Sequence, residues 1–178
     1  KDIKRSQIIE HDSYVGELAR YIAADLTQFR KIQGDETLGG MVICETSEQA
    51  RKLYEAFQNL NDGGEAKTIQ IKLDGNEWMV ANAIPMIGYQ KHPLRVGLIL
   101  HDSDDKETRK QIIKEFKKNM TIDLLIVFNM LLTGFDAPRL KRLYFGRKLK
   151  DHNLLQALTR VNRPYKDNRY GYVIDFAN

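Results

Sequence analysis

The sequence has one cysteine, no long apolar run and no leader-like start, and each absence excludes a class of protein. Cys44 has no partner for an internal disulfide, which excludes a disulfide-stabilised secreted domain and fits a reducing compartment. No stretch approaches the roughly 20 apolar residues that a transmembrane helix needs. The sequence does not start with the charged segment followed by an apolar one that is typical of a secretion signal. We therefore expect a cytoplasmic protein, with Cys44 as a buried strand residue in the run MVIC.

The sequence also lacks a phosphate-binding loop. No G-x-x-x-x-G-K-[ST] segment occurs, so no loop of this chain cradles a nucleotide and no lysine is placed at its β and γ phosphates. An acidic strand end that would hold Mg²⁺ beside such a loop is missing too. A nucleotide handled by this chain must therefore be held by another domain. The lack of a glycine-rich cofactor loop also disfavours a small-molecule transferase.

Length and composition indicate one globular domain with a proper core. The chain has 178 residues, of which 42% are hydrophobic and 29% charged. It begins without methionine and stops after an apolar run, so we expect a fragment of a larger multidomain chain. The net charge of +4 permits a polyanionic partner. Basic residues concentrate late, where such a partner is expected to bind: Arg139, Lys141, Arg142, Arg147, Lys148 and Lys150.

Alternating apolar patterns predict an α/β fold, with a mostly parallel sheet sandwiched by helices. Residues 1–36 are expected to form a leading helix that packs on this single module, with clear helical spacing over 14–32. A strand over 39–44 leads to a helix that Thr46 and Gln49 open as a capping box. Further strands are expected at 96–100, 122–128, 143–145 and 171–176, an edge strand at 68–73, and helices from 104 and over 151–162. We assign no element to 74–93.

The segment QALTRVNR, Gln156 to Arg163, carries the strongest chemical signal. At helical pitch, Gln156, Arg160 and Arg163 share one stripe. Two guanidinium groups one turn apart suit the charge that develops on a transferring phosphoryl group, as arginine fingers do. A solvated basic helix face is the plainer interpretation. The opposite, core-facing side is expected to hold Leu154, Leu155, Leu158 and Val161.

Two loops that follow strands offer further candidate contacts. In NMLLTGFDAP, Thr133 and Gly134 bring a hydroxyl and a close backbone approach, and Asp136 addresses a ribose hydroxyl or pairs with an arginine. The loop from Cys44 to Ser47 precedes a helix N-terminus, where free N–H groups favour an anion. A plain turn at Gly134 and a simple cap at Thr46 are the competing interpretations.

One further cluster resembles a metal site at first sight. His101 lies beside several aspartates, but one histidine in a helix-opening loop is more typical of capping and solvation than of metal ligation. We therefore predict no metal site in this chain. The aromatic residues after the arginine stripe are expected to pack in the core or at its edge, and not to stack on bases: Tyr165, Tyr170, Tyr172 and Phe176.

With these residues in view, the chain resembles the second RecA-like domain of superfamily 2 helicases and translocases, and most closely the motor (restriction) subunit of type I restriction enzymes. MVICETSEQARKLYEAF looks like motif IV with its helix, and LILHDSDDKETRKQIIKEFKKN like the following strand and helix. LLTGFDAP resembles motif V, LLQALTRVNRPY resembles motif VI, and NRYGYVIDF is similar to the restriction-subunit pattern. Together these segments span most of residues 40–176.

The resemblance implies a role for each matched residue. Arg160 and Arg163 contact the γ-phosphate region, and Gln156 couples nucleotide state to the domain interface. Gly134 and Asp136 lie on the nucleotide side. The tracked DNA strand meets Thr133 and Gly134 of motif V and Cys44, Glu45 and Thr46 of motif IV.

The implied protein is an ATP-dependent translocase of double-stranded DNA within a type I restriction endonuclease. ATP and Mg²⁺ are held mainly by a first RecA-like domain of the same chain, and modification and specificity subunits complete the complex. This segment alone is expected to be inactive. The alternative is a non-hydrolytic nucleic-acid-binding or regulatory module that uses the late basic residues.

Overall fold

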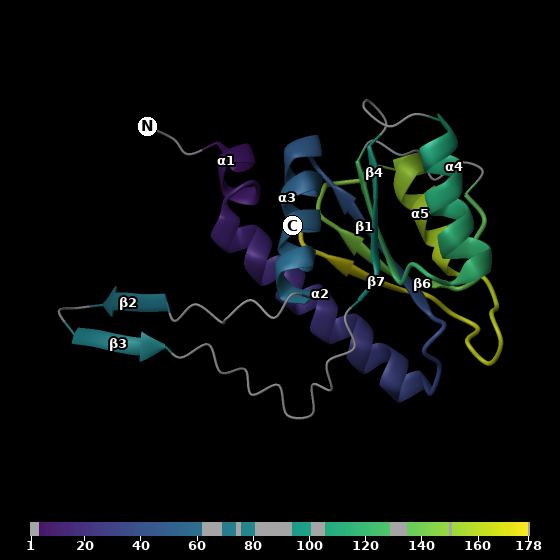
Figure 1. The fold of residues 1–178 in the computed structure, drawn as a ribbon, viewed down its shortest axis with the longest axis horizontal. Coiled ribbons are helices and arrows are strands. Elements are labelled where there is room, and N and C mark those ends of the chain that lie inside the picture. The colour runs from purple at the N-terminus through teal and green to yellow at the C-terminus, as the bar shows by residue number, and fades with distance from the viewer. Residues whose placement is uncertain are drawn as a thin grey trace.

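The computed structural model describes residues 4–61, 69–73, 76–80, 94–100, 106–128, 135–149 and 151–177 (Figure 1). Its elements, in chain order, are α1 (Arg5–Ile9), α2 (Asp12–Gln33), β1 (Gly39–Cys44), α3 (Ser47–Asn61), β2 (Ile69–Leu73), β3 (Asn76–Val80), β4 (Val96–Leu100), α4 (Lys106–Lys114), the π-helical turn η1 (Glu115–Asn119), β5 (Leu124–Phe128), β6 (Leu140–Phe145), α5 (Asp151–Val161) and β7 (Tyr172–Asp175).

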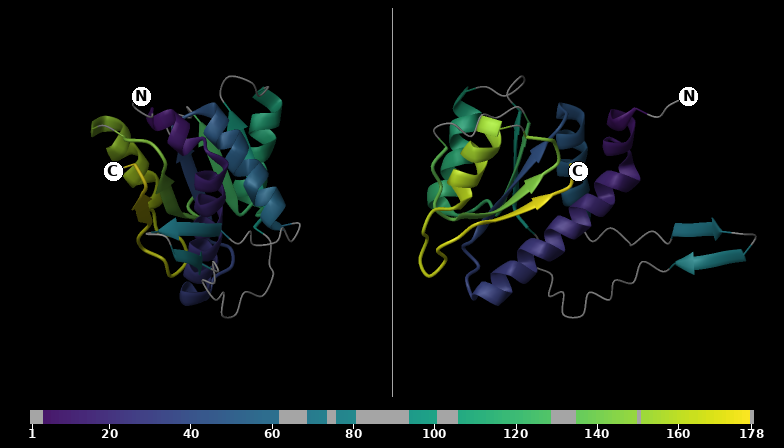
Figure 2. Two further views of the ribbon diagram at one scale, coloured as in Figure 1. Left: turned by 90° about the vertical axis from the view of Figure 1, so that its left-hand side faces the viewer. Right: turned by 180° about the vertical axis from the view of Figure 1, so that it is seen from behind.

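Five strands form one parallel sheet in the order β4-β5-β1-β6-β7. Helices α2 and α3 cover one face, while α4, η1 and α5 cover the other, as the views in Figures 1 and 2 show. Each face has its own apolar core. The predicted parallel sheet between helical layers is confirmed. Because every strand runs the same way, the carboxyl ends gather at one edge of the sheet and the amino ends at the other.

Strand β1 occupies the centre of the sheet and is buried along its whole length. A strand covered on both faces has only apolar or small residues, as GGMVIC does. Gly39 is required here because a Cβ at this position would lie 2.6 Å from the Phe116 ring. The prediction for Cys44 is confirmed: its side chain is fully buried, and burial raises the pKa of its thiol to about 12.

Other elements fall close to their predicted ranges. The periodicity over 14–32 becomes α2, whose terminal Gly34 has a left-handed φ of 64°. The Thr46 hydroxyl caps α3 by accepting a hydrogen bond from the main-chain N–H of Gln49 at 3.0 Å. The Gln49 side chain accepts from the main-chain N–H of Glu45, whereas in a full capping box it would accept from that of Thr46. At the other end of the chain, β7 falls within the predicted 171–176.

Two strand predictions need correction. The segment 68–73, predicted as an edge strand, forms β2, which pairs antiparallel with β3 in a two-stranded sheet separate from the main one. Strand β3 lies within 74–93, where no element was expected. Pairing between two segments that are neighbours in sequence closes only a short loop, so it competes well with addition to a distant edge.

Three of the six late basic residues bond groups within the fold and are not presented to a polyanion. Arg139 and Lys141 are buried, with 2% and 0% of their area exposed. Arg142 forms a two-bond ion pair with Asp25 of α2. Arg139 lies just before β6, and Lys141 and Arg142 lie in its first half, since the strand extends three residues further toward the amino end than its apolar run 143–145 suggested. Charged residues in the sequence near a strand suggest side chains in contact with solvent, whereas each of these three cations bonds a group within the fold.

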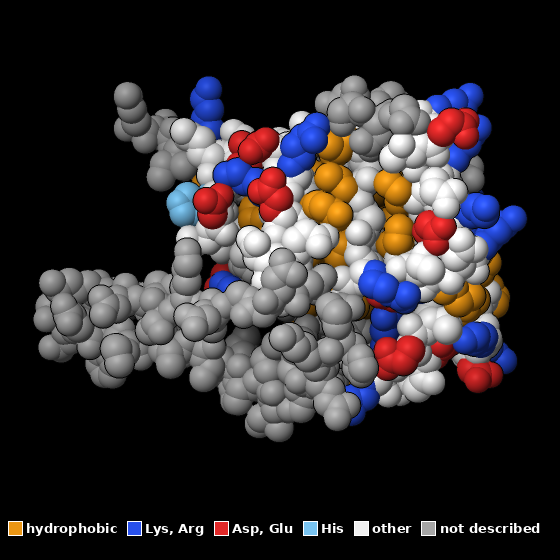
Figure 3. Space-filling view, viewed as in Figure 1, with side chains coloured by type: hydrophobic (Ala, Val, Ile, Leu, Met, Phe, Trp, Pro, Cys, Tyr) orange, Lys and Arg blue, Asp and Glu red, His pale blue; other side chains and the backbone are white. Residues whose placement is uncertain are grey.

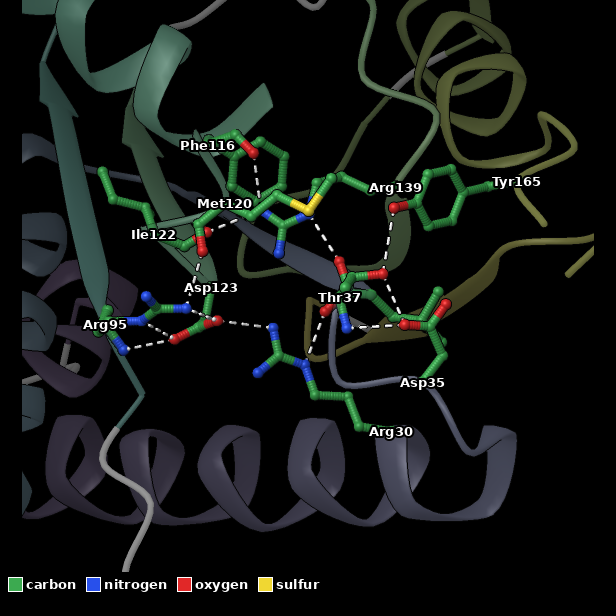
Figure 4. A network of polar contacts seen from close by, with 11 residues as sticks. Arg30, Asp35, Thr37, Arg95, Phe116, Met120, Ile122, Asp123, Arg139 and Tyr165 are labelled. Atoms are coloured by element: carbon green, nitrogen blue, oxygen red, sulfur yellow. Dashed lines mark hydrogen bonds and ion pairs between the residues drawn. The ribbon is translucent and has the colours of Figure 1, made fainter. Parts of the chain in front are cut away.

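A buried carboxylate joins several elements at the amino edge of the sheet (Figure 4). Asp123, just before β5, accepts from Arg30 of α2 at 2.9 Å and from the Arg95 side chain at 2.9 and 3.0 Å. Burial acts to raise the pKa of Asp123, but the hydrogen bonds of Arg95 and the charge of Arg30 outweigh it, and the pKa lies below its usual value. This carboxylate therefore stays ionised and holds α2, β4 and β5 together.

Arg139 occupies the neighbouring position in Figure 4 and bonds main-chain oxygens. It donates to the carbonyls of Thr37 at 2.6 Å, Phe116 at 2.7 Å and Ile122 at 2.8 Å, and its guanidinium lies 4.6 Å from the centre of the Phe116 ring. Burial first, and then the charge of Arg30, lower the pKa of Arg139 to about 10, so it remains a cation at neutral pH. It fastens β6 to the segments that enter β1 and β5.

We predict that Asp123→Asn destabilises the fold by about 3 kcal/mol or more at neutral pH, because removal of one partner leaves a buried guanidinium unpaired. Since the folded pKa is depressed, the contribution of Asp123 is present above its unfolded pKa of about 4 and is lost as pH falls through the folded pKa. Denaturant unfolding of both proteins from pH 7 to pH 3 measures this. A stability difference that stays constant over that range would contradict the prediction.

Candidate functional site

The arginine stripe lies on α5, which packs on the sheet through a narrow apolar face. Ala157 and Val161 are fully buried and Leu154 packs beside them. The prediction that Leu155 and Leu158 also face the core is wrong, since 62% and 37% of their areas are exposed. The small side chain of Ala157 lets α5 lie close to β6. Leu155 and Leu158, at the sides of the apolar face of α5, therefore do not pack against the sheet.

The end of α5 sets the position of the second arginine. The helix ends at Val161, so Arg163 lies in the bend beyond the helix and not at the predicted seventh position along its face. Pro164 explains this, because a residue before proline avoids helical backbone angles. Arg160 remains in the last turn of α5, half-buried, and its Nε has no hydrogen-bond partner among the residues that the structure describes.

Lys141 of β6 anchors this end of the helix. Its buried Nζ donates to the carbonyl oxygen of Arg163 and lies 3.5 Å from that of Val161. The last carbonyls of a helix lack partners within the helix, so a cation there satisfies them. Burial lowers the pKa of Lys141. The sequence did not identify Lys141 as a site residue, because nothing in the basic segment around it indicates that its side chain points into the fold.

Arg163 and Asp136 form an ion pair across two segments. The Nη1 to Oδ1 distance is 2.5 Å, and the two side chains are 41% and 54% exposed. Of the two roles predicted for Asp136, the structure has the pairing with an arginine. Exposed pairs contribute about 0 to 1 kcal/mol, so Arg163 can exchange Asp136 for another anion at little cost. The arginine is therefore fixed in direction but not occupied by a strong internal bond.

Asp136 itself is held between η1 and the end of α5. Its neighbours Phe135 and Ala137 are buried in the core that α5 covers, and the Phe135 ring lies 6.2 Å from that of Phe116 in η1. The predicted residues Thr133 and Gly134 lie outside the described part of the chain. Gln156 is half-buried, and its carbonyl accepts from Thr159 at 2.8 Å.

The second group of candidates lies at the carboxyl end of β1. The buried thiol of Cys44 leaves only its main chain for an external contact. Glu45 accepts from Arg5 of α1 at 2.8 Å. Thr46 donates to Glu10 at 2.6 Å while it caps α3. The two polar side chains are thus engaged from within the chain, which leaves main-chain groups as the plainest contacts for a ligand.

The segment from α1 to α2 makes these contacts and covers part of the carboxyl edge. Arg5 also donates to the carbonyl of Ala177 at 3.1 Å, so it connects the loop after β1 with the end of β7. Lys52 of α3 donates to the Glu10 carbonyl at 2.9 Å and to Asp12 at 2.8 Å. The prediction of one leading helix over residues 1–36 needs correction, since the described part of this segment forms two helices, α1 and α2. The break lies at His11, whose backbone is extended and whose side chain caps α2 by accepting from the main-chain N–H of Ser13.

The aromatic residues after α5 pack in different ways. Tyr165 and Phe176 are half-buried and contact the core on the α2 side, as predicted. The Tyr172 ring lies 5.4 Å from that of Phe29, and Tyr170 is 65% exposed. The His101 cluster lies outside the described residues, and the described ones contain no group of three or more metal-ligating side chains. None of the helices in the described ranges has the length and apolarity to cross a membrane.

Comparison with known sequences places these sites in a family. Residues 89–178 match the family described as type I restriction enzyme subunit R, domain 3. The putative type I restriction enzyme MjaVIIIP endonuclease subunit of Methanocaldococcus jannaschii is 32% identical over 97% of this chain and 16% of its own length. The putative MjaVIIP endonuclease subunit of the same organism is 47% identical over 42% of this chain and 7% of its own length. The chain thus spans less than a fifth of these curated relatives.

Solved structures agree on the fold. A fragment of a putative HsdR subunit of a type I restriction enzyme from Vibrio vulnificus superposes with a TM-score of 0.61 at 19% identity, over 98% of this chain and 29% of that one. Domain 2 of the DEAD-box helicase Mss116p, solved with an RNA duplex, gives 0.54 at 13% identity, over 93% and 50%. The chain belongs to the restriction (R) subunit family of type I restriction enzymes, as a domain with the RecA-like fold of helicase second domains.

Proposed function

We propose that this domain is one half of an ATP-dependent motor that translocates double-stranded DNA. Arg160 and Arg163 act as arginine fingers on ATP and Mg²⁺ that the first RecA-like domain of the same subunit holds. The loops after β1 and β5 grip the DNA backbone. Closing and opening of the two domains moves DNA past the subunit. The observation that carries the proposal is the exposed, weakly paired Arg163 at the anchored end of α5.

The ion pair of Arg163 supports a role in phosphate binding. Arg163 has a planar fork that matches phosphate oxygens, and its present partner Asp136 is held by a surface pair of little net energy. An incoming γ-phosphate carries more charge than a carboxylate and displaces Asp136 from the fork. Asp136 then serves as the resting partner of the finger, which keeps the side chain extended in the absence of nucleotide.

The position of Arg160 adds to this argument. Its Nε is buried without a hydrogen-bond partner in the described residues, and an unsatisfied buried donor costs about 1 to 3 kcal/mol. Closure of a second domain over α5 can supply an acceptor to this guanidinium. The two arginines thus differ in their resting state, one paired with a carboxylate and one incompletely bonded.

The alternative of a purely electrostatic binding module loses its main support. Of the six late basic residues, Arg139 and Lys141 are buried and Arg142 is bound to Asp25. Arg147 is half-buried and Lys148 exposed. This end of the chain therefore offers a polyanion far less accessible charge than the sequence suggested.

We predict that Arg163→Ala in the full-length subunit lowers DNA-stimulated ATP turnover by about 10³-fold or more, as loss of an arginine finger does. DNA binding should persist, because Arg163 is not among the proposed DNA contacts. Arg169→Ala, which removes an exposed arginine a few residues further on, is the matched control. Steady-state ATPase rates and DNA titrations test both variants. Undiminished ATPase activity in Arg163→Ala would refute the assignment.

We also predict that Lys141→Met lowers kcat by about 10-fold to 100-fold, because a displacement of the fingers by about 1 Å costs rate on this scale. Methionine is an unbranched side chain one atom shorter than lysine, and it cannot donate to the carbonyl of Arg163. Affinity for DNA should be unchanged. Lys148→Met, at an exposed site before α5, should behave as wild type. If kcat of the Lys141 variant equals that of the control, the anchor has no role in finger position.

A third prediction separates the motor from the binding module. The isolated 178-residue chain should bind duplex DNA weakly, and the full-length subunit should bind more tightly with an ATP analogue than without nucleotide. An electrostatic module instead binds DNA equally well alone and in the subunit, with a steep dependence on salt and none on nucleotide. Fluorescence titrations of both proteins, with and without the analogue, make the comparison.

A further inference from the structure

A row of four lysines runs along the exposed side of α4 and η1. Lys106, Lys110, Lys114 and Lys118, here called the lysine row, follow one another at four-residue intervals, and all are exposed. In Figure 3, Lys and Arg side chains, with Asp and Glu side chains among them, lie along the right-hand rim of the molecule, the side where Figure 1 has α4. The resemblance described above covers this segment as the strand and helix that follow motif IV, but it assigns no role to these four lysines.

The π-helical turn keeps the row in line. In a regular α-helix each four-residue step drifts by about 40° around the axis, so a fourth lysine falls well to the side of the first. A π turn has more residues per turn and rotates less per residue, which brings Lys118 back toward the line of Lys110 and Lys114. The neighbouring Lys117 is instead half-buried, with its Nζ 5.8 Å from the centre of the Phe135 ring.

The acidic residues of this segment leave most of the row unneutralised. Glu107 pairs with Lys110 at 2.9 Å. Glu115 accepts from Gln111 at 2.6 Å, from Asn119 at 2.9 Å and from Thr121, all of them neutral donors. Within the described ranges, the remaining lysines of the row form no ion pair. The Glu115 carboxylate thus makes its hydrogen bonds within the π turn, and the charge of Lys114 acts on it without an ion pair.

The row does not serve the stability of its own helix. Lysines four residues apart on a helix repel one another, and this occurs at each of the three steps along the row. Lys106 also lies in the first turn of α4, where the helix dipole disfavours a cation. A polyanion that binds along the row relieves both unfavourable terms, whereas water and salt screen them only in part.

We propose that the lysine row is a second DNA-binding surface that contacts the phosphate backbone of a duplex. The row covers about 18 Å along the helix axis. Over that length one strand of a duplex presents about five phosphates. Helix α4 starts after β4 and so at the carboxyl edge of the sheet, the edge where the loop after β1 is proposed to grip DNA. The identification of the polyanion as DNA rests on the proposed translocase function.

The sharpest test compares two adjacent lysines. Lys118→Gln and Lys117→Gln in the full-length subunit remove the same charge one residue apart, but only Lys118 lies in the row. For Lys118→Gln we expect the slope of log affinity against log salt to fall by about 0.9, and Kd for a duplex of unrelated sequence to rise about eightfold at 0.1 M salt. Lys117→Gln should leave both values near wild type.

A double variant gives a larger effect with its own control. Lys114→Gln with Lys118→Gln should reduce the slope by about 1.8. Arg20→Gln with Lys31→Gln removes two cations from α2, on the other face of the sheet, and should leave it unchanged. Thermal unfolding of each variant shows that the fold is intact.

The outcomes separate this proposal from the motor assignment. Slopes that are equal in the row variants and their controls overturn the row as a DNA surface, whatever Arg163→Ala does. An unchanged slope with weakened assembly onto the modification subunit would identify an acidic protein as the occupant and also overturn it. If the slope falls as predicted while Arg163→Ala keeps full ATPase activity, the row stands and the arginine-finger assignment fails.

Discussion

Buried basic side chains bond main-chain carbonyls at the ends of helices and strands, and the arrangement of this domain depends on these bonds. Arg30 donates to the Leu38 carbonyl before β1, and Arg139 to those of Phe116 and Ile122 around η1 and before β5. Lys141 does the same at the end of α5. Carbonyls at such ends lack partners in their own element, and a buried one without a bond is costly. Cations therefore fix where elements begin and end, and Asp123 offsets part of their charge.

The direction of the strands separates two tasks. The carboxyl ends carry the loop from Cys44 to Thr46, packed against α1, while α5 returns toward the amino ends and places Arg163 there, beside the carbonyls that Lys141 holds. The proposed DNA contacts of the loop after β1 and the proposed nucleotide contact of Arg163 therefore lie at opposite edges of the sheet. In this arrangement, movement of the domain relative to its partner can change the nucleotide site and the DNA grip together.

The strongly periodic parts of the sequence predicted the fold well. The run MVIC and the amphipathic pattern of α2 match their observed elements because burial on both faces, or on one stripe, leaves a clear pattern. The position of Arg163 near Asp136 was available as one of two alternatives. The surroundings of charged side chains could not be predicted, because the sequence pattern around Lys141 is the same whether its Nζ contacts water or a buried carbonyl. The exposure of Leu155 and Leu158 was missed for the related reason that composition does not reveal how closely a helix approaches its sheet.

In the proposed motor, the guanidinium of Arg163 leaves Asp136 to bind the phosphoryl group during ATP hydrolysis. A structure of the full-length subunit with duplex DNA, Mg²⁺, ADP and a metal fluoride that mimics the transferring phosphoryl group tests it most directly. We expect Arg163 to donate to the fluoride at hydrogen-bond distance, with its bond to Asp136 broken and Lys141 still bonded to the carbonyl of Arg163. A structure in which the two motor domains have closed on the analogue while Arg163 keeps its bond to Asp136 would contradict it.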